Sequence, residues 1–217
     1  MRTSRSLSIA WALLATGATL PPCLAAQEAA PRLPFGVPAV VLPVQRAVPG
    51  PGGAWPAGSR SEEEAARALD AELAFALGER RGAEAWALPE AVRRRVARNP
   101  TIGVDPDRLA YQGLLAAPDR WEQIYEPLHG QLRTLAALFG TRYVVLPLAL
   151  SVSPPEPGIA GCKSEGAERG ELLLALIDIR RSAVLWHGTI TGRPACLDSG
   201  ALLALLAARV AAEITDS

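Results

Sequence analysis

The sequence predicts a mixed α/β domain in which helices pack on a single mixed β-sheet of about five strands. Short apolar, β-branched runs alternate with segments whose apolar residues recur at three- and four-residue steps, in the order β-α-β-α-α-β-β-β-α. Early strands separated by helices favour parallel neighbours, whereas two late strands joined by a short turn favour an antiparallel hairpin. The length of 217 residues, 49 % of them hydrophobic and 20 % charged, suits one globular core.

Residues 1–26 are predicted to be a secretory signal peptide. A basic start precedes an apolar stretch from Leu7 to Leu20, and small residues follow. The apolar stretch has about 14 residues, fewer than the ~20 that a membrane-spanning helix needs. We therefore expect cleavage near Ala25 or Ala26, and a periplasmic or secreted mature chain with no stable membrane span.

Cys23 raises the alternative of an outer-membrane lipoprotein, in which the lipid-bearing cysteine follows a small residue. Here Pro21 and Pro22 precede the cysteine. Proline fixes φ and lacks an N–H donor, which suits poorly a peptidase that binds an extended substrate, so lipidation is disfavoured. Residues 27–38, rich in Ala and Pro, are predicted to be a flexible leader, and residues 39–217 a single globular domain.

The domain opens with a strand and a well-marked helix. Ala39–Val44 is a β-branched run typical of a buried strand, and Pro43 within it indicates an edge position or a bulge. After a turn-rich loop over 48–58, Ser61 and Glu64 have capping-box spacing. Four apolar residues then form one buried helical stripe: Ala66, Leu69, Leu73 and Leu77. We expect Gly82 to end this helix.

A strand containing Trp86 is expected over 83–88, followed by a short helix that Pro89 opens, with Val92 and Val96 as its apolar positions. Four arginines spread over the rest of its circumference: Arg93, Arg94, Arg95 and Arg98. Because consecutive helical residues diverge by about 100°, we interpret these arginines as a solvated helix face and not as an anion-binding patch.

Further helix signals follow. The Asp105-Pro106 pair predicts a helix that continues to about Ala117. The next apolar stripe consists of Trp121, Ile124, Leu128, Leu132, Leu135 and Phe139. Pro127 either kinks this helix or starts a new one, and Gly140 closes it. Trp121 and Tyr125 are interpreted as helical core and not as a ligand-stacking pair.

The C-terminal part predicts three strands and a last helix. Two strands, 142–152 and 172–179, are apolar on both faces. A third strand, 184–191, follows a turn near Arg181-Ser182. Its alternation predicts that Val184, Trp186 and Ile190 share one face, and that Leu185, His187, Thr189 and Thr191 share the other. Asp198 or Ser199 caps a final helix whose apolar positions are Leu202, Leu203, Leu206 and Val210.

Cys162 and Cys196 remain after removal of the signal, an even pair in an oxidising compartment, and are predicted to form a disulfide. A metal site at these cysteines would need additional ligands, for which only His129 and His187 are available, and no C-x-x-C or H-x-x-x-H spacing occurs. We expect neither a metal nor a cofactor. The formal net charge of zero argues against a nucleic-acid binder.

Motifs for catalysis are missing from the sequence. It contains no G-x-S-x-G elbow, no G-x-x-x-x-G-K-[ST] loop, and no G-x-G-x-x-G between a strand and a helix. A Ser-His-Asp site would have to use His129 or His187, and we expect neither to be catalytic. The sequence therefore favours a protein that is not an enzyme.

Three short segments resemble the periplasmic α/β domain of the TolB N-terminal domain, the curli-secretion lipoprotein and the LpoB-type activators of penicillin-binding proteins. Ala39–Val44 is similar to the opening strand, and Leu135–Leu146 to a helix-glycine-strand passage. Leu176–Trp186 is similar to a hairpin built as strand, Asp, turn, Gly, strand, Trp. Asp178 and the final tryptophan match this pattern, while Ser182 stands where glycine is usual.

The resemblance implies a non-enzymatic envelope protein that binds another envelope protein or forms part of an assembly. An exported hydrolase with an unrecognised site, or a lipid-anchored secretion subunit, are the alternatives. Leu185, His187 and Thr189 mark a candidate edge where a partner strand could add. The competing interpretation is that another strand or the final helix already covers this edge.

Overall fold

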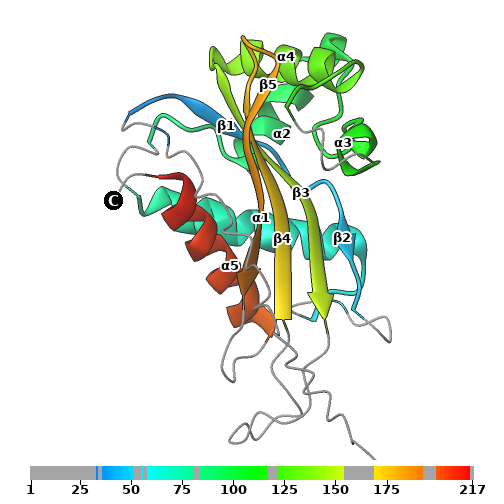
Figure 1. The fold of residues 1–217 in the computed structure, drawn as a ribbon, viewed down its shortest axis with the longest axis vertical. Coiled ribbons are helices and arrows are strands. Elements are labelled where there is room, and N and C mark those ends of the chain that lie inside the picture. The colour runs from blue at the N-terminus through cyan, green and yellow to red at the C-terminus, as the bar shows by residue number, and fades with distance from the viewer. Residues whose placement is uncertain are drawn as a thin grey trace, which may run out of the picture.

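The computed structural model describes residues 33, 36–50, 55, 58–80, 84–116, 122–153, 169–192 and 199–215. The described chain forms one five-stranded mixed sheet with helices packed against it, as predicted (Figure 1). Its strands are β1 (Ala39–Val41), β2 (Ala47–Val48), β3 (Tyr143–Ser153), β4 (Arg169–Asp178) and β5 (Ala183–Gly192). Their spatial order is β1-β3-β4-β5, and β2 also pairs with β3.

Strand directions follow the connections. β1 and β2 run parallel to β3, whereas β3, β4 and β5 form successive antiparallel pairs. β1 and β2 are two pieces of one edge, because the chain between them still donates hydrogen bonds to β3, from Leu42 N to Val145 O and from Gln45 N to Pro147 O, each 3.0 Å. Pro43 lies in this interruption; of the two predicted alternatives, an edge position and a bulge, the structure has the edge position.

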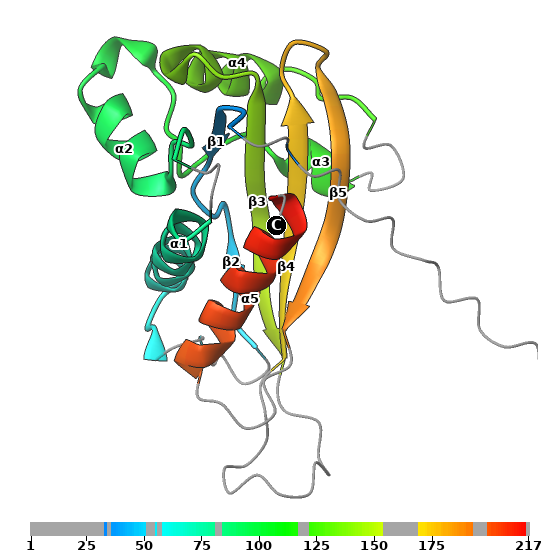
Figure 2. The ribbon, with the colours of Figure 1, turned by 90° about the vertical axis from the view of Figure 1, so that its left-hand side faces the viewer.

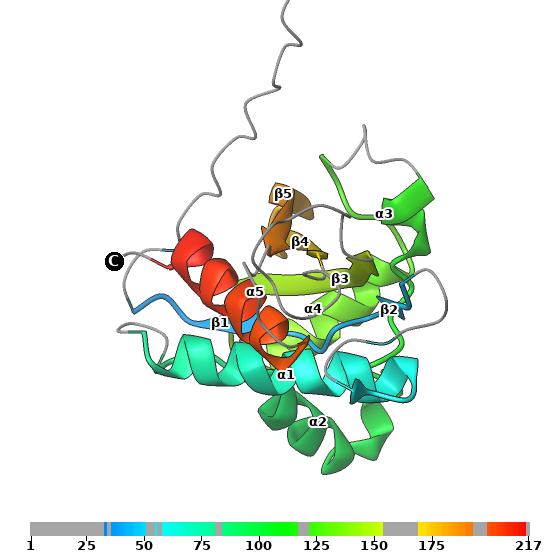
Figure 3. The same ribbon diagram turned by 90° about the horizontal axis from the view of Figure 1, so that it is seen from below.

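The helices cover both faces of the sheet. They are α1 (Glu62–Gly78), α2 (Pro89–Ala97), α3 (Gln112–Ala116), α4 (Leu128–Phe139) and α5 (Ser199–Ile214), with a 3₁₀ turn, η3 (Pro100–Ile102). α1 and α5 pack together on one face, while α3 and α4 contribute to the core of the other (Figures 2 and 3). α2 lies beside β1 (Figure 2).

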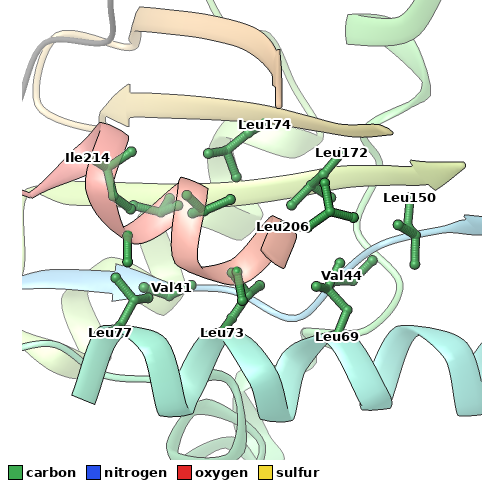
Figure 4. Close-up of a cluster of buried hydrophobic side chains, with 14 of the residues drawn as sticks. Val41, Val44, Leu69, Leu73, Leu77, Leu150, Leu172, Leu174, Leu206 and Ile214 are labelled. Atoms are coloured by element: carbon green, nitrogen blue, oxygen red, sulfur yellow. The ribbon is translucent and has the colours of Figure 1, made fainter. Parts of the chain in front are cut away.

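On the first face, the predicted stripe of α1 is buried. Leu69, Leu73 and Leu77 point at the sheet and at α5 (Figure 4). The approach of α5 is close because Gly170 and Gly192, which are cross-strand partners, lie beneath it. A Cβ at either glycine would lie between 2.9 and 3.2 Å from the side chains of two leucines of α5, Leu202 and Leu206.

The two faces have separate cores, and a β-bulge changes which residues of β3 enter each. The register with β4 shifts between Pro147 and Ala149. Before the bulge, Leu146 packs into the core beneath α4, whereas after it Leu150 packs beneath α1 and α5. Pro147 is tolerated here because a bulge relaxes the demand for a ladder hydrogen bond.

A second bulge corrects the predicted faces of β5. The register with β4 shifts between Leu176 and Ile177, which makes Leu185 the extra residue. Trp186 and Ile190 therefore face α5, while Val184 packs in the opposite core. The prediction that Val184 shares a face with Trp186 was wrong, because strict alternation does not continue through a bulge.

Three expected elements differ from the structure. α1 ends at Gly78, and Gly82 lies outside the described residues. The strand expected over 83–88 is reduced to one parallel bridge, between Ala87 and Val40. The helix expected from Asp105 is wrong: the Asp105 carboxylate accepts a hydrogen bond from Asp107 N, 3.0 Å away, and the resulting turn delays the helix to α3.

Pro127 starts a new helix and does not kink a longer one, because α4 begins at the next residue and ends at Gly140, which has φ 64°. Tyr125, before this helix, is 70 % exposed, so its interpretation as helical core was wrong. Trp121 lies outside the described residues.

Part of the predicted leader packs on the domain. Leu33 is buried and its N–H donates to Ile214 O at the end of α5, 3.1 Å away. The carbonyl of Val37 accepts a hydrogen bond from Trp86 Nε1 (2.9 Å), and that of Pro38 accepts one from Thr141 Oγ1 (2.6 Å). The packed domain therefore uses residues ahead of Ala39.

The predicted signal peptide, Cys23 and the predicted disulfide partners Cys162 and Cys196 lie outside the described residues. Gly170 pairs with Gly192, so the start of β4 and the end of β5 lie at the same end of the sheet. Within the described chain, none of the helices has the length and hydropathy that crossing a bilayer requires.

Candidate partner-binding edge

β5 is the outer strand of the sheet on the side away from β1. Leu185, at the bulge, is 38 % exposed, His187 is exposed, and Thr189 is half-buried. His187 and Thr189 lie on the face opposite Trp186, as the sequence predicted. The three candidate residues therefore follow one another along an outer strand.

The backbone direction along this edge follows from one hydrogen bond. Val184 N donates to Glu122 O, 3.1 Å away, so this N–H points away from β4. Leu185 is the extra bulge residue, and regular alternation resumes with Trp186 turned toward β4. The residues whose backbone groups then point outward are His187, Thr189 and Thr191. One of these groups, the Thr191 carbonyl, accepts a hydrogen bond from the Arg209 guanidinium of α5.

In the described chain, residues 122–124 pair with the start of this edge. Gln123 forms an antiparallel bridge with Ala183, and Ile124 N donates to Ser182 O, 3.0 Å away. From Leu185 to Gly192, no strand of the described chain pairs with the outer side of β5.

A groove of about 370 Å³ runs between this part of β5 and α5. Its β5 wall includes Trp186, Ile190 and Thr191, and its α5 wall Arg209, Ala212 and Glu213. The sequence analysis missed the α5 wall. These three residues stand opposite the apolar stripe of α5, which marks them as solvent-facing. That they lie beside β5 follows only from the packing of the helix on the sheet.

The β4–β5 turn brings together a serine, a histidine and a carboxylate. Ser182 Oγ lies 2.9 Å from His129 Nε2, and His129 Nδ1 lies 3.4 Å from Glu126 Oε1. Ser182 has φ 53°, the left-handed conformation that explains why glycine is usual at this position in the similar hairpin. The order nucleophile, base, acid is that of a Ser-His-Glu hydrolytic site.

Hydrolysis also needs N–H groups that are free to stabilise an oxyanion. The three N–H groups up to the serine are engaged inside the turn. Arg180 N donates to Asp178 Oδ1 (3.0 Å), Arg181 N to Asp178 O (3.2 Å), and Ser182 N to Ile179 O (3.3 Å). The contact between Ser182 and His129 links the turn to α4.

Asp178 also anchors the sheet end. Its carboxylate, buried in the turn, pairs with the Arg142 guanidinium, with Arg142 Nε 2.9 Å from Asp178 Oδ1. The hydrogen bond from Arg142 holds the pKa of Asp178 below its usual value, against the opposing effect of burial. The aspartate of the family-like hairpin thus has a structural role here.

The opposite side of the molecule holds a partly buried ionic cluster. Arg93 of α2 pairs with Asp70 of α1, and its Nε lies 2.9 Å from Asp107 Oδ1. Asp70 also accepts a hydrogen bond from Val44 N, 2.9 Å away. Burial outweighs these partners and raises the pKa of Asp70 to about 6. The interpretation of Arg93 as part of a solvated face was wrong, although Arg94, Arg95 and Arg98 are exposed.

No group of three or more potential metal-binding side chains gathers in the part of the chain that the structure describes. The sequence matches no protein-family model and no curated protein.

Solved structures align with the chain at low identity. The C-terminal domain of LpoB from Salmonella enterica is 16 % identical, with a TM-score of 0.39 over 76 % of this chain and 88 % of that one. The PelC dodecamer from Paraburkholderia phytofirmans is 14 % identical (TM-score 0.39, 88 % and 97 %). Lipoprotein GNA1162 from Neisseria meningitidis is 18 % identical (TM-score 0.39, 80 % and 95 %).

LpoB-type domains, which the sequence resembles, are thus among the structures that align with this chain. Two of the three proteins above are described as a lipoprotein and as a dodecamer.

Proposed function

We propose that this chain is an exported envelope protein that binds another protein and catalyses no reaction. The partner adds an extended segment to the outer edge of β5. The observation that carries the proposal is the groove between α5 and the outer strand β5, which Trp186, Ile190 and Thr191 line on the side of the strand. Edge strands recognise extended peptides through main-chain hydrogen bonds, and adjoining pockets select alternate side chains.

The groove suggests how such a segment would lie. Side chains of an added strand alternate between two faces, so every second one would enter the space beside Ile190 and Ala212. Arg209 and Glu213 stand one helical turn apart on the α5 wall and offer both signs of charge to polar groups of the segment. The Arg209 guanidinium would exchange the Thr191 carbonyl for a group of the partner.

A substitution of one edge residue tests this site. Thr189→Pro places a ring where the partner backbone would lie, so we expect at least about a tenfold loss of affinity. Thr189→Val keeps the N–H and the side-chain shape, and is the matched control. Partners are captured from periplasmic extract with the tagged chain, identified, and titrated against each purified variant.

Circular dichroism verifies that the Thr189→Pro chain remains folded. The expected pattern is retention of the partner by Thr189→Val and its loss by Thr189→Pro. Equal affinity for both folded variants would place the partner elsewhere on the molecule.

Export has its own measurement. We expect the chain purified from its native host to start near Ala26 or Gln27. The apolar run is short, and the residue before Cys23 is a proline and not the small residue that lipidation requires. Intact-mass spectrometry reports the new N-terminus directly. A diacylglycerol-modified N-terminal Cys23 would show instead that the chain is a lipoprotein.

A further inference from the structure

The chain enters the packed domain beside the end of α5. Leu33 is buried, its N–H donates to Ile214 O at 3.1 Å, and it forms a parallel bridge with Thr215. Because the two chains of a parallel bridge run in the same direction, the chain approaches Leu33 from the side of Ile214. The bridge therefore directs the residues that precede Leu33 back along the last turns of α5.

The groove between β5 and α5 begins at these turns. Ala212 and Glu213 belong to its α5 wall near the bridge, and Arg209 lies one helical turn further from it. β5 and α5 run in opposite directions (Figure 2). An extended segment that leads through this groove to Leu33 is thus parallel to α5 and antiparallel to β5.

We infer that the groove holds the chain's own N-terminal segment, residues 27–32 (QEAAPR), laid antiparallel along the outer edge of β5. These residues directly precede the anchored Leu33. Six extended residues span about 20 Å, and the stretch of β5 from Trp186 to Thr191 that lines the groove spans about 17 Å. The segment therefore has the length of the strand that forms the groove wall.

The order of charges supports this direction. Arg32 directly precedes Leu33 and so comes beside Glu213, while Glu28, four residues earlier, comes towards Arg209. Both pairs have opposite charges, which attract each other. The reverse direction would bring Glu28 to Glu213 and Arg32 to Arg209, and both pairs would repel.

The middle of the segment has small side chains that suit a groove of about 370 Å³. Ala29 and Ala30 would lie beside Ile190 and Ala212, which line the groove between its charged ends. Pro31 has no N–H to donate, which an outermost strand tolerates because one of its sides needs no partner.

The short connection makes weak binding sufficient. A segment joined to the rim of its own site is present there at an effective concentration in the millimolar range, so it fills the groove even when the free peptide binds weakly. The segment then competes with a partner for the edge of β5, a consequence that rests on the proposed function. Deleting residues 27–31 should raise the affinity for that partner by about tenfold.

Disulfide trapping tests the docking without any partner. In the chain with Ala30→Cys and Ala212→Cys, one thiol lies on the segment and one on the groove wall, and mild oxidation should link them within one molecule. Ala204→Cys in place of Ala212→Cys is the matched control, because this exposed alanine lies two turns away on another face of α5. Mass spectrometry of non-reduced peptides separates the engineered link from any that involve Cys162 or Cys196.

Backbone amide resonances give a second measure. Deleting residues 27–31 should shift the resonances of Ile190 and Ala212 in the groove, and leave unchanged that of Val92 in the opposite core. Free QEAAPR peptide, added to the truncated chain at millimolar concentration, should reverse these shifts. The peptide QRAAPE, in which the two charges are exchanged, should not.

The outcomes separate this inference from the proposed function. With each variant shown to be folded by circular dichroism, a link that forms no faster than in the Ala204→Cys control, or groove resonances that ignore the deletion, would overturn the docking. The partner site tested by Thr189→Pro would still stand. A segment that docks while its deletion leaves the partner affinity unchanged would overturn the competition, and would place the partner away from β5.

Discussion

Replacing Arg93 by methionine is expected to lower the free energy of unfolding by about 3–5 kcal/mol. Arg93 is the cation beside Asp70, whose side chain is only 4 % exposed, and it also binds Asp107. Methionine retains most of the side-chain length but leaves the Asp70 carboxylate buried without its counter-charge. Breaking a buried pair from one side costs more than the pair itself contributes. Urea unfolding of the two chains measures the difference.

The pH dependence of this loss identifies its cause. Burial already raises the pKa of Asp70 to about 6, above the ordinary 3.8. The folded chain therefore holds this proton more tightly than the unfolded chain, so Asp70 favours folding at low pH and loses that contribution as pH rises from about 4 to about 6. Without Arg93 the pKa rises further, and the deficit of the variant should be smaller at about pH 5 than at about pH 8.

Asp178 has the opposite effect on the pH dependence of stability, and comparing the unfolding free energies of the wild-type and Arg93→Met chains at the same pH cancels it. Its lowered pKa stabilises the fold above the ordinary aspartate range, and this contribution is lost on acidification in both chains alike. Adding Asp70→Asn to Arg93→Met should recover much of the loss, because a neutral amide replaces the buried charge. A deficit that is independent of pH and is not relieved by Asp70→Asn would assign the effect of Arg93 to packing alone.

Truncation of Leu73 to alanine should cost about 2–5 kcal/mol. Leu73 is fully buried between α1, the sheet and α5 (Figure 4), so its removal takes apolar area from the core and leaves a cavity. Leu185→Ala makes the same chemical change at a side chain that is 38 % exposed, and should cost about 1 kcal/mol or less. Thermal and urea unfolding compare the two. Equal losses would contradict the assignment of Leu73 to the main core.

Local patterns predicted the elements that bury a continuous face. The stripe of Leu69, Leu73 and Leu77 is buried as predicted, because helical periodicity depends on neighbours one turn away. The antiparallel pairing of the last two strands also followed from a short connection. The helix expected from Asp105 failed because the same aspartate that caps helices also closes turns, and the local sequence does not distinguish the two.

The candidate site was predicted in part, because one of its two walls depends on local sequence and the other on tertiary packing. The outward face of β5 at His187 and Thr189 is a property of strand alternation, which the sequence displays. The wall formed by Arg209 and Glu213 belongs to a helix that follows β5 in sequence, but its position against the strand depends on Gly170 and Gly192 lying beneath that helix.

By itself, the sequence determined the mixed α/β class, the main helical stripes and the antiparallel hairpin, since each depends on residues close together in the chain. Tertiary structure alone decided which residues of different helices and strands contact one another. Two bulges redirect side chains of β3 and β5, and Arg93 leaves a polar helix face to pair with Asp70, 23 residues away. Such contacts form when separate helices and strands pack on a common core, and periodicity within one element carries no information about its neighbours in space.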